Sequence, residues 1–375
     1  MSPAAPVSRA APDVAVAPRR AESEAAVAAF AIGALGAVYG LILAIVEPGE
    51  LLADGATSFA LWAAVASGVG AALAAALGYW RSRSLPGQLW RRSLPTWKLT
   101  ANTLSVVIVH TVLAFIETYV IYRLIGLGFI GLPVGPIWSI VMMAVTVGLT
   151  AHLVYLSVSR MDTQRMSSLL RTFIAFGVFT AMIIAPEPDW WKVHFSHLGT
   201  FHGELSSVFF NGTLIAGGFL VTTFAVYIAH DMTALVADGV LASPRSPRIV
   251  SALFVVMGAA FAGVGLVAVD VNRLWHDVAA LALAAMFLGM LIAGPWLLRG
   301  LPRTYFVWSW TILAAVAVSG LTFAFGAFSL TGVEIVVFVL IFGWISLFIR
   351  YLGVAGQSAP PAADTTPALR TATTS

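Results

Sequence analysis

Cysteine is absent from the 375-residue chain, and charged residues are scarce, at 10% of the composition. Without cysteine there is no disulfide, no thiolate metal site and no cysteine-bound iron–sulfur cluster. Soluble domains contain about 25% charged residues. The low charge, 59% hydrophobic residues and a mean hydropathy of +0.92 therefore exclude an ordinary soluble protein and predict an integral membrane protein whose first partner is the lipid bilayer.

Lysine is nearly absent as well, since Lys98 and Lys192 are the two lysines among 20 basic residues. The net charge is only +3, although the isoelectric point is near 9.4. The arginines form no stripe of the kind that binds nucleic acid, so we expect no nucleic-acid partner. Arginine in place of lysine, with abundant alanine, is typical of a GC-rich bacterial genome, and the predicted location is a bacterial plasma membrane.

Apolar runs of about 20 residues recur along the chain, and this is the length that crosses about 30 Å of hydrocarbon. Ten runs predict an all-α, polytopic membrane helix bundle, at residues 27–46, 57–79, 101–122, 137–158, 169–186, 206–229, 249–269, 278–298, 305–326 and 333–352. Residues 1–26 and 353–375 are rich in alanine with proline or threonine, which predicts disordered tails.

The basic residues indicate how these helices are oriented. Seventeen of the 20 fall on one side together with both ends of the chain, and the other side holds Arg123, Lys192 and Arg273. Because cytoplasmic loops carry the excess of lysine and arginine, both ends are predicted to face the cytoplasm.

Two ionisable residues inside the third run indicate a polar path. His110 and Glu117 are seven residues apart, so they share one helix face, separated by about 10 Å of rise. Ionisable groups at this depth are costly to bury and often mark proton relays or substrate paths. The alternative is a structural role, in which Glu117 ties helices together through Asn211 of the sixth run.

Histidine and carboxylate residues are concentrated in the outer loops. His194, His197, His202 and Glu204 lie in one loop, and His276 lies in a second. Imidazole and carboxylate groups bind zinc where thiolates are absent, and a zinc-bound water would be a nucleophile. The spacing matches no established zinc motif. We therefore expect no cofactor, with zinc as the alternative.

Residues 80–98, on the predicted cytoplasmic side, interleave tryptophans with basic residues. Tryptophan favours the headgroup layer, and each nearby cation gains about 1 kcal/mol from an anionic leaflet. The segment is predicted to be an interfacial anchor, with lipid binding or partner docking as the alternative.

Short motifs in the second half of the chain resemble a known family. The pattern Asp189-Trp190-Trp191, Phe195-Ser196-x-Leu198-Gly199 and Phe210-Asn211, followed by Gly217, Gly263, Gly265, His276 and Phe287, resembles domain-of-unknown-function family 998 (DUF998). The resemblance covers residues 166–352. It implies a six-helix prokaryotic membrane domain, distantly similar to Frag/DRAM/Sfk-type proteins. The four predicted helices of residues 27–165 precede this unit and depart from the family pattern. It implies no reaction, but it groups Ser196, Asn211 and His276 into one outer feature.

Three functions are compatible with these patterns. The favoured one is a non-enzymatic protein that binds or moves a small or lipid-like molecule through an outward-facing polar site, lined by Glu117, His110, Asn211, Ser196 and His276. The second is an extracytoplasmic metal-dependent hydrolase of a lipid or cell-envelope precursor, with ligands His194, His197, His202 and His276 and the base Glu204. The third is a membrane scaffold or assembly subunit, whose protein partners the sequence does not identify.

Overall fold

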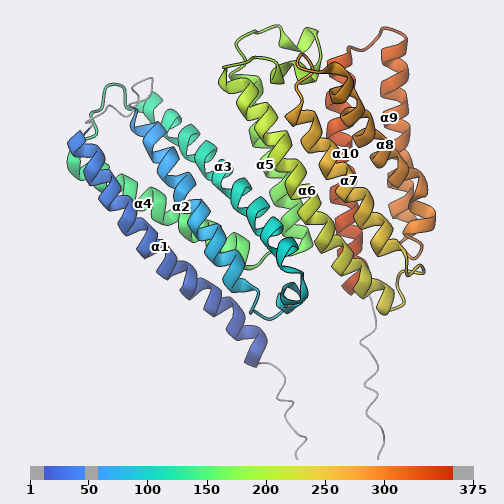
Figure 1. The fold of residues 1–375 in the computed structure, drawn as a ribbon, viewed down its shortest axis with the longest axis horizontal. Coiled ribbons are helices and arrows are strands. Elements are labelled where there is room, and N and C mark those ends of the chain that lie inside the picture. Colours follow the sequence, from blue (N-terminus) through green and yellow to red (C-terminus); the bar gives the residue numbers. More distant parts are fainter. Residues whose placement is uncertain (1–11, 47–57, 358–375) are drawn as a thin grey trace, which may run out of the picture.

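The computed structural model describes residues 12–46 and 58–357. Over these residues it is helical, and ten of its helices are long and apolar enough to cross a membrane. The predicted polytopic helix bundle is confirmed. The start of α1 (Pro12–Val46) and the end of α10 (Leu330–Gln357) lie at the same end of the bundle (Figure 1), as an even number of crossings requires.

The first four helices form one packed group. They are α1, α2 (Phe59–Ser82), α3 (Thr96–Gly128) and α4 (Pro136–Ser159). α4 lies against α1 and α2, and α2 lies against α3, whereas α3 and α4 touch each other little. α1 approaches α4 closely because of glycine: a Cβ at Gly40 would lie 2.5 Å from the carbonyl oxygen of Ser139. Small residues let membrane helices gain van der Waals contact in this way.

The other six helices form a closed ring. They are α5 (Thr163–Ile183), α6 (Leu205–Ala237), α7 (Ser246–Leu266), α8 (Arg273–Leu297), α9 (Arg303–Ala324) and α10. Each packs against the next, and α10 returns to α5. The interior is aromatic: Phe254, Trp344 and Phe348 are fully buried, and the last two stack with ring centroids 5.4 Å apart. Large aromatic rings provide much of the buried area in such a core.

The structure corrects both predicted ends of the helical region. α1 begins at Pro12, so the disordered tail predicted for residues 1–26 is wrong for residues 12–26. Alanine, glutamate and arginine, which favour helix, dominate this segment, and a helix can start well before its apolar part. α10 continues past the predicted limit of 352 to Gln357. The remaining predicted tail residues, 1–11 and 358–375, lie outside the described residues.

The two groups of helices meet where α3 packs against α5 and α6. A hydrogen bond of 2.9 Å joins the buried hydroxyl groups of Tyr79 on α2 and Tyr227 on α6. The short helix η1 (Leu89–Ser93) lies at the end of the bundle where α1 starts, and η2 (Trp190–Lys192) and η3 (Phe195–Gly199) cap the opposite end of the ring (Figure 1).

Arg91 of η1 corrects the prediction of a purely interfacial anchor at residues 80–98. Its side chain is fully buried, and it donates hydrogen bonds to the Tyr79 carbonyl at 2.5 Å and to the Ser82 hydroxyl at 3.0 Å. The guanidinium also lies 3.6 Å from the centre of the Tyr79 ring. These acceptors belong to the last turn of α2, where free carbonyls and the helix dipole favour a cation. Arg91 therefore caps α2.

The tryptophans of the same segment divide into two kinds. Trp90 stacks on His230 of α6 with ring centroids 4.2 Å apart, so it joins the two groups of helices. Trp80 and Trp97 are exposed, each beside a basic side chain, as an interfacial anchor requires. The anchor prediction is thus wrong for Trp90 and compatible with the exposed positions of Trp80 and Trp97.

Candidate functional site

A groove separates α3 from α4, because both helices pack on α2 and touch each other little. Its volume is 440 Å³, and Leu169 of α5 also lines it. Both sequence-predicted residues of α3 line it, so the expectation that His110 and Glu117 share one face of a helix is confirmed.

The mouth of the groove is apolar and lies on the outside of the bundle. Val145, Leu149 and Leu153 of α4 line it and are 60%, 55% and 57% exposed. They are spaced one turn apart along a membrane-spanning helix, so these side chains face hydrocarbon. The groove therefore opens sideways to the bilayer and is not a pore through the protein.

Glu117 is the carboxylate in this groove. It is exposed on α3, and it has no hydrogen bond or ion pair with any other part of the chain that the structure describes. Neighbouring polar groups are already engaged: the Tyr122 hydroxyl bonds the Thr146 hydroxyl across the groove at 2.7 Å. Glu117 is thus available to a ligand.

His110 has both ring nitrogens occupied. Nδ1 lies 2.8 Å from the Val106 carbonyl, and Nε2 lies 3.1 Å from the Ser157 hydroxyl of α4. A carbonyl can only accept, so Nδ1 carries the proton and Nε2 accepts from Ser157 when the ring is neutral. The buried imidazole ties α3 to α4 at the inner end of the groove. His110 therefore holds α3 against α4 seven residues before Glu117.

The other predicted site residues do not share this groove. The Asn211 side chain donates to the Gly199 carbonyl at 2.9 Å, and His276 Nδ1 donates to the Val267 carbonyl at 2.8 Å. Ser196 lies in η3. All three belong to the outer end of the six-helix ring. The predicted common lining is therefore split between two places, and the predicted tie between Glu117 and Asn211 is wrong because Glu117 faces α4.

The outer histidines are separated by their own partners. His202 bonds Asp270 at 2.6 Å, and His197 lies 3.5 Å from Glu187. The rings of His194 and His197 are 5.8 Å apart. Over residues 12–46 and 58–357, no group of three or more histidine or carboxylate side chains is arranged to hold a metal ion. The predicted zinc set of His194, His197, His202, His276 and Glu204 is not brought together.

Local surroundings shift two pKa values in this outer cap. Burial, followed by the nearby His197, lowers the pKa of His194. For Asp270, slight burial raises the pKa, but the hydrogen bond from His202 outweighs it and holds the pKa below its usual value. Asp270 is paired with His202, and neither of these groups contributes to the shift of His194, so the two pKa shifts do not belong to one shared site.

Sequence reasoning missed Glu334, the carboxylate of α10. It accepts a hydrogen bond of 2.6 Å from the backbone N–H of Phe195 and so holds η3 onto the ring. Phe195 in turn packs against Phe210 and Phe338. The available signal was a lone acid within the last apolar run, which is expected to have a partner inside a membrane protein.

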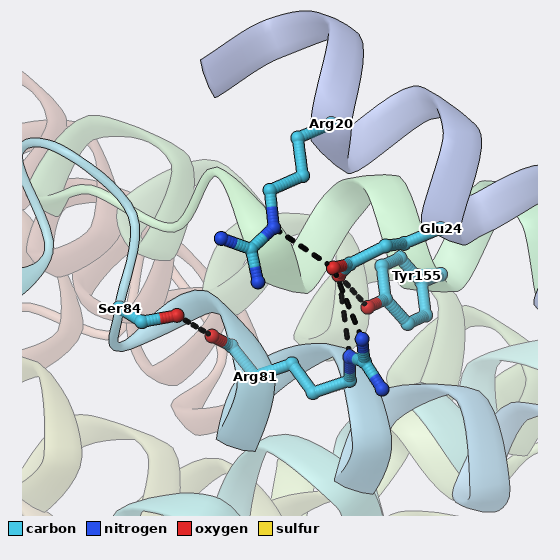
Figure 2. A network of polar contacts seen from close by, with 5 residues as sticks. All are labelled: Arg20, Glu24, Arg81, Ser84 and Tyr155. Carbon is cyan, nitrogen blue, oxygen red and sulfur yellow. Dashed lines mark hydrogen bonds and ion pairs between the residues drawn. The ribbon is translucent and has the colours of Figure 1, made fainter. Parts of the chain in front are cut away.

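A second missed group joins α1, α2 and α4 (Figure 2). Glu24 of α1 accepts a hydrogen bond from the Tyr155 hydroxyl at 2.6 Å and contacts Arg20 at 3.0 Å and Arg81 at 3.2 Å. Figure 2 shows the three donors converging on one carboxylate from three helices. Because Glu24 fell in the predicted tail, its role could not be recognised. It fastens α1 to the bundle.

No protein-family model matches the chain, and no curated protein and no solved structure is detectably similar to it.

Proposed function

We propose that the protein binds a lipid-like molecule in the groove between α3 and α4, and that this molecule enters sideways from the bilayer. The observation that carries the proposal is Glu117, an unpartnered carboxylate in a groove with an apolar mouth. This revises the outward-facing site expected from the sequence, since the groove excludes Asn211, Ser196 and His276.

The chemistry of the ligand follows from the lining. A polar or ionised group within hydrocarbon costs about 2.5–3.5 kcal/mol on insertion scales unless it finds a partner. A ligand that places a hydrogen-bond donor or a cation on Glu117 removes much of this cost, while its chain covers Leu149 and Leu153. The volume of 440 Å³ lies within the range of small-molecule sites, roughly 300–1,000 Å³. The best candidates are single-chain amphiphiles with an amine or other donor headgroup.

The sequence also supports a membrane location and an orientation for this binding function. The distribution of arginine supports insertion with both ends in the cytoplasm, and the arginine-rich, alanine-rich composition supports a bacterial plasma membrane. The resemblance of residues 166–352 to family 998 stays a prediction. A hydrolase would need the outer histidines to converge, so the binding function is the better supported of the two.

The test is equilibrium binding of a long-chain alkylamine that carries a fluorophore at its chain end. The purified protein in detergent is titrated with this probe and with the alcohol of the same chain length. We expect Glu117→Gln to weaken amine binding about tenfold, because a charge-assisted hydrogen bond is lost, and to change alcohol binding little. In the wild type, amine binding should depend on pH, and in the variant this dependence should disappear.

Matched controls separate the groove from the general surface. Leu149→Trp fills the groove and should weaken both probes, whereas Leu281→Trp, on an exposed face of α8, should change neither. Glu204→Gln changes a carboxylate in the outer loop and should bind like the wild type. Wild-type amine binding by Glu117→Gln, with an unchanged melting temperature, would contradict the proposal.

A further inference from the structure

A second groove follows α5 and α10 on the six-helix ring. It consists of two adjoining hollows of 360 and 630 Å³, which share Arg171, Gly343 and Ser346. The first is lined mainly by apolar side chains, among them Phe179 and Val339, which are both 61% exposed to the surroundings of the bundle. The second has a mixed lining and holds both arginines of the groove, Arg171 and Arg350. Together they form one groove with an apolar part and a polar end.

Two arginines mark the polar end at matching depth. Arg171 is eight residues from the start of α5, and Arg350 is seven residues from the end of α10. At 1.5 Å per residue, each lies about 10–12 Å inside the same end of the bundle. Arg350 follows Ser346 by one turn, so it lies on the face of α10 that meets Arg171.

These arginines have no carboxylate partner among the described residues. Arg171 donates to the hydroxyl groups of Ser346 and Ser168, which are neutral. Two acids near this end are engaged elsewhere: Asp162 contacts Arg165 at 3.6 Å, and Asp231 accepts from Thr163 at 2.5 Å. The groove therefore carries uncompensated positive charge.

The groove also contains a hydroxyl group without a hydrogen-bond partner and open space beside a glycine. Ser167, which is 2% exposed, lines the polar part, and its hydroxyl has no hydrogen-bond partner in the protein. Gly343 stands where the two parts meet, and a Cβ there would have no neighbour within 4 Å. The space beside Gly343 is thus part of the groove and not part of the helix packing.

We propose that this groove binds one anionic phospholipid, with the phosphate on Arg171 and Arg350 and an acyl chain along the apolar part beside Phe179 and Val339. Arginine suits this role because its planar fork binds phosphate oxygens through two hydrogen bonds. Basic pockets between membrane helices bind anionic headgroups in the same manner. The depth of about 10–12 Å fits long side chains that reach to the headgroup layer. This proposal does not depend on the α3–α4 groove.

The experiment measures binding of phosphatidylglycerol and phosphatidylcholine, with equal chains and a spin label at the chain end, to the delipidated full-length protein. The wild type should prefer phosphatidylglycerol. Each arginine should contribute a factor of roughly five to the ratio of phosphatidylglycerol to phosphatidylcholine affinity, because a cation near an anionic lipid gains about 1 kcal/mol. Arg350→Gln alone should lose that factor. The double variant, which combines Arg171→Gln with Arg350→Gln, should bind the two lipids equally.

Three controls make the outcomes distinct. Arg299→Gln removes an exposed arginine at the same end of the bundle and should keep the preference. Gly343→Leu fills the groove without a backbone clash and should weaken both lipids. Glu117→Gln should leave the lipid preference unchanged, so failure of the other proposal does not affect this one.

Several results would overturn the proposal. Equal binding of the two lipids by the wild type is one, and an equal loss in Arg299→Gln and Arg350→Gln is another. Complete displacement of phosphatidylglycerol by inorganic phosphate at matched concentration would show a free-anion site in place of a lipid site. Melting temperatures of all variants identify any loss of folding, and Arg350→Gln remains informative because Arg350 makes no hydrogen bond that holds α10 in place.

Discussion

The two grooves of this molecule have the same general form and opposite charge. The groove between α3 and α4 holds Glu117 without a partner, and the groove between α5 and α10 holds Arg171 and Arg350 without a carboxylate. Each opens on an apolar face, and each lies in a different group of helices. The two grooves therefore differ in the sign of their unpaired charge and not in their shape. We expect this charge to determine which molecules each groove binds.

The two groups of helices also differ in how they are held together. In the first, alanine and glycine allow close packing, and a groove is left between α3 and α4 because each of them packs on α2. In the second, Phe254, Trp344 and Phe348 fill the ring. Both grooves lie at the lipid-facing surface of their helices. Either kind of interior packing is therefore compatible with a groove.

Charge reversal should change ligand binding by the two grooves more than any other substitution. Glu117→Arg should weaken binding of the alkylamine by roughly 100-fold, because an attraction is replaced by a repulsion. Arg350→Glu should weaken binding of phosphatidylglycerol and leave the amine unchanged. Fluorescence titration and spin-label binding measure the two effects in the same preparations. Equal changes for both ligands in either variant would show that the two grooves are not independent.

A medium effect is expected from the network that fastens α1. Glu24→Gln removes the charge that Arg20, Arg81 and Tyr155 share, and it should lower the stability of the first group of helices by about 1–2 kcal/mol. The apparent melting temperature measures this loss. Glu22→Gln is the matched control. Its pair with Arg160 is more exposed, so its effect should be smaller. An equal effect of the two substitutions would contradict a shared network.

The smallest expected effect is a pH dependence of the outer cap. The pKa of His194 is lower in the folded protein than its ordinary value of 6.5. As the pH falls through 6.5 toward the folded value, the unfolded cap takes up a proton first, so the stability of the cap falls. Hydrogen exchange of residues 190–204, corrected for intrinsic rates, should therefore be faster at about pH 5 than at about pH 7.

His194→Gln should reduce this pH dependence, and the exchange of α6 serves as the internal reference. An unchanged profile in His194→Gln would assign the effect to another group. Asp270, whose pKa is also lowered, contributes in the same direction only below its ordinary value of 3.8.

The ten membrane-spanning helices could be predicted from the sequence, because each is marked by an apolar run long enough to cross the bilayer. The shared face of His110 and Glu117 also followed from their spacing of seven residues. The burial of Arg91 could not be predicted, since it depends on where the last turn of α2 lies relative to η1. Closeness in sequence likewise misled at the outer loop. There His197 lies in η3 and His202 lies in the turn that follows it, so the two side chains meet different partners, which their spacing does not reveal.

Photolabelling tests the central claim that two grooves of opposite charge bind different amphiphiles. Two probes with the same chain and the same diazirine position, one an amine and one a phosphate, are crosslinked to the protein in vesicles, and the labelled residues are mapped by mass spectrometry. The account predicts that the amine labels α3 and α4 beside Glu117 and that the phosphate labels α5 and α10 beside Arg171. Labelling of the same positions by both probes would contradict it.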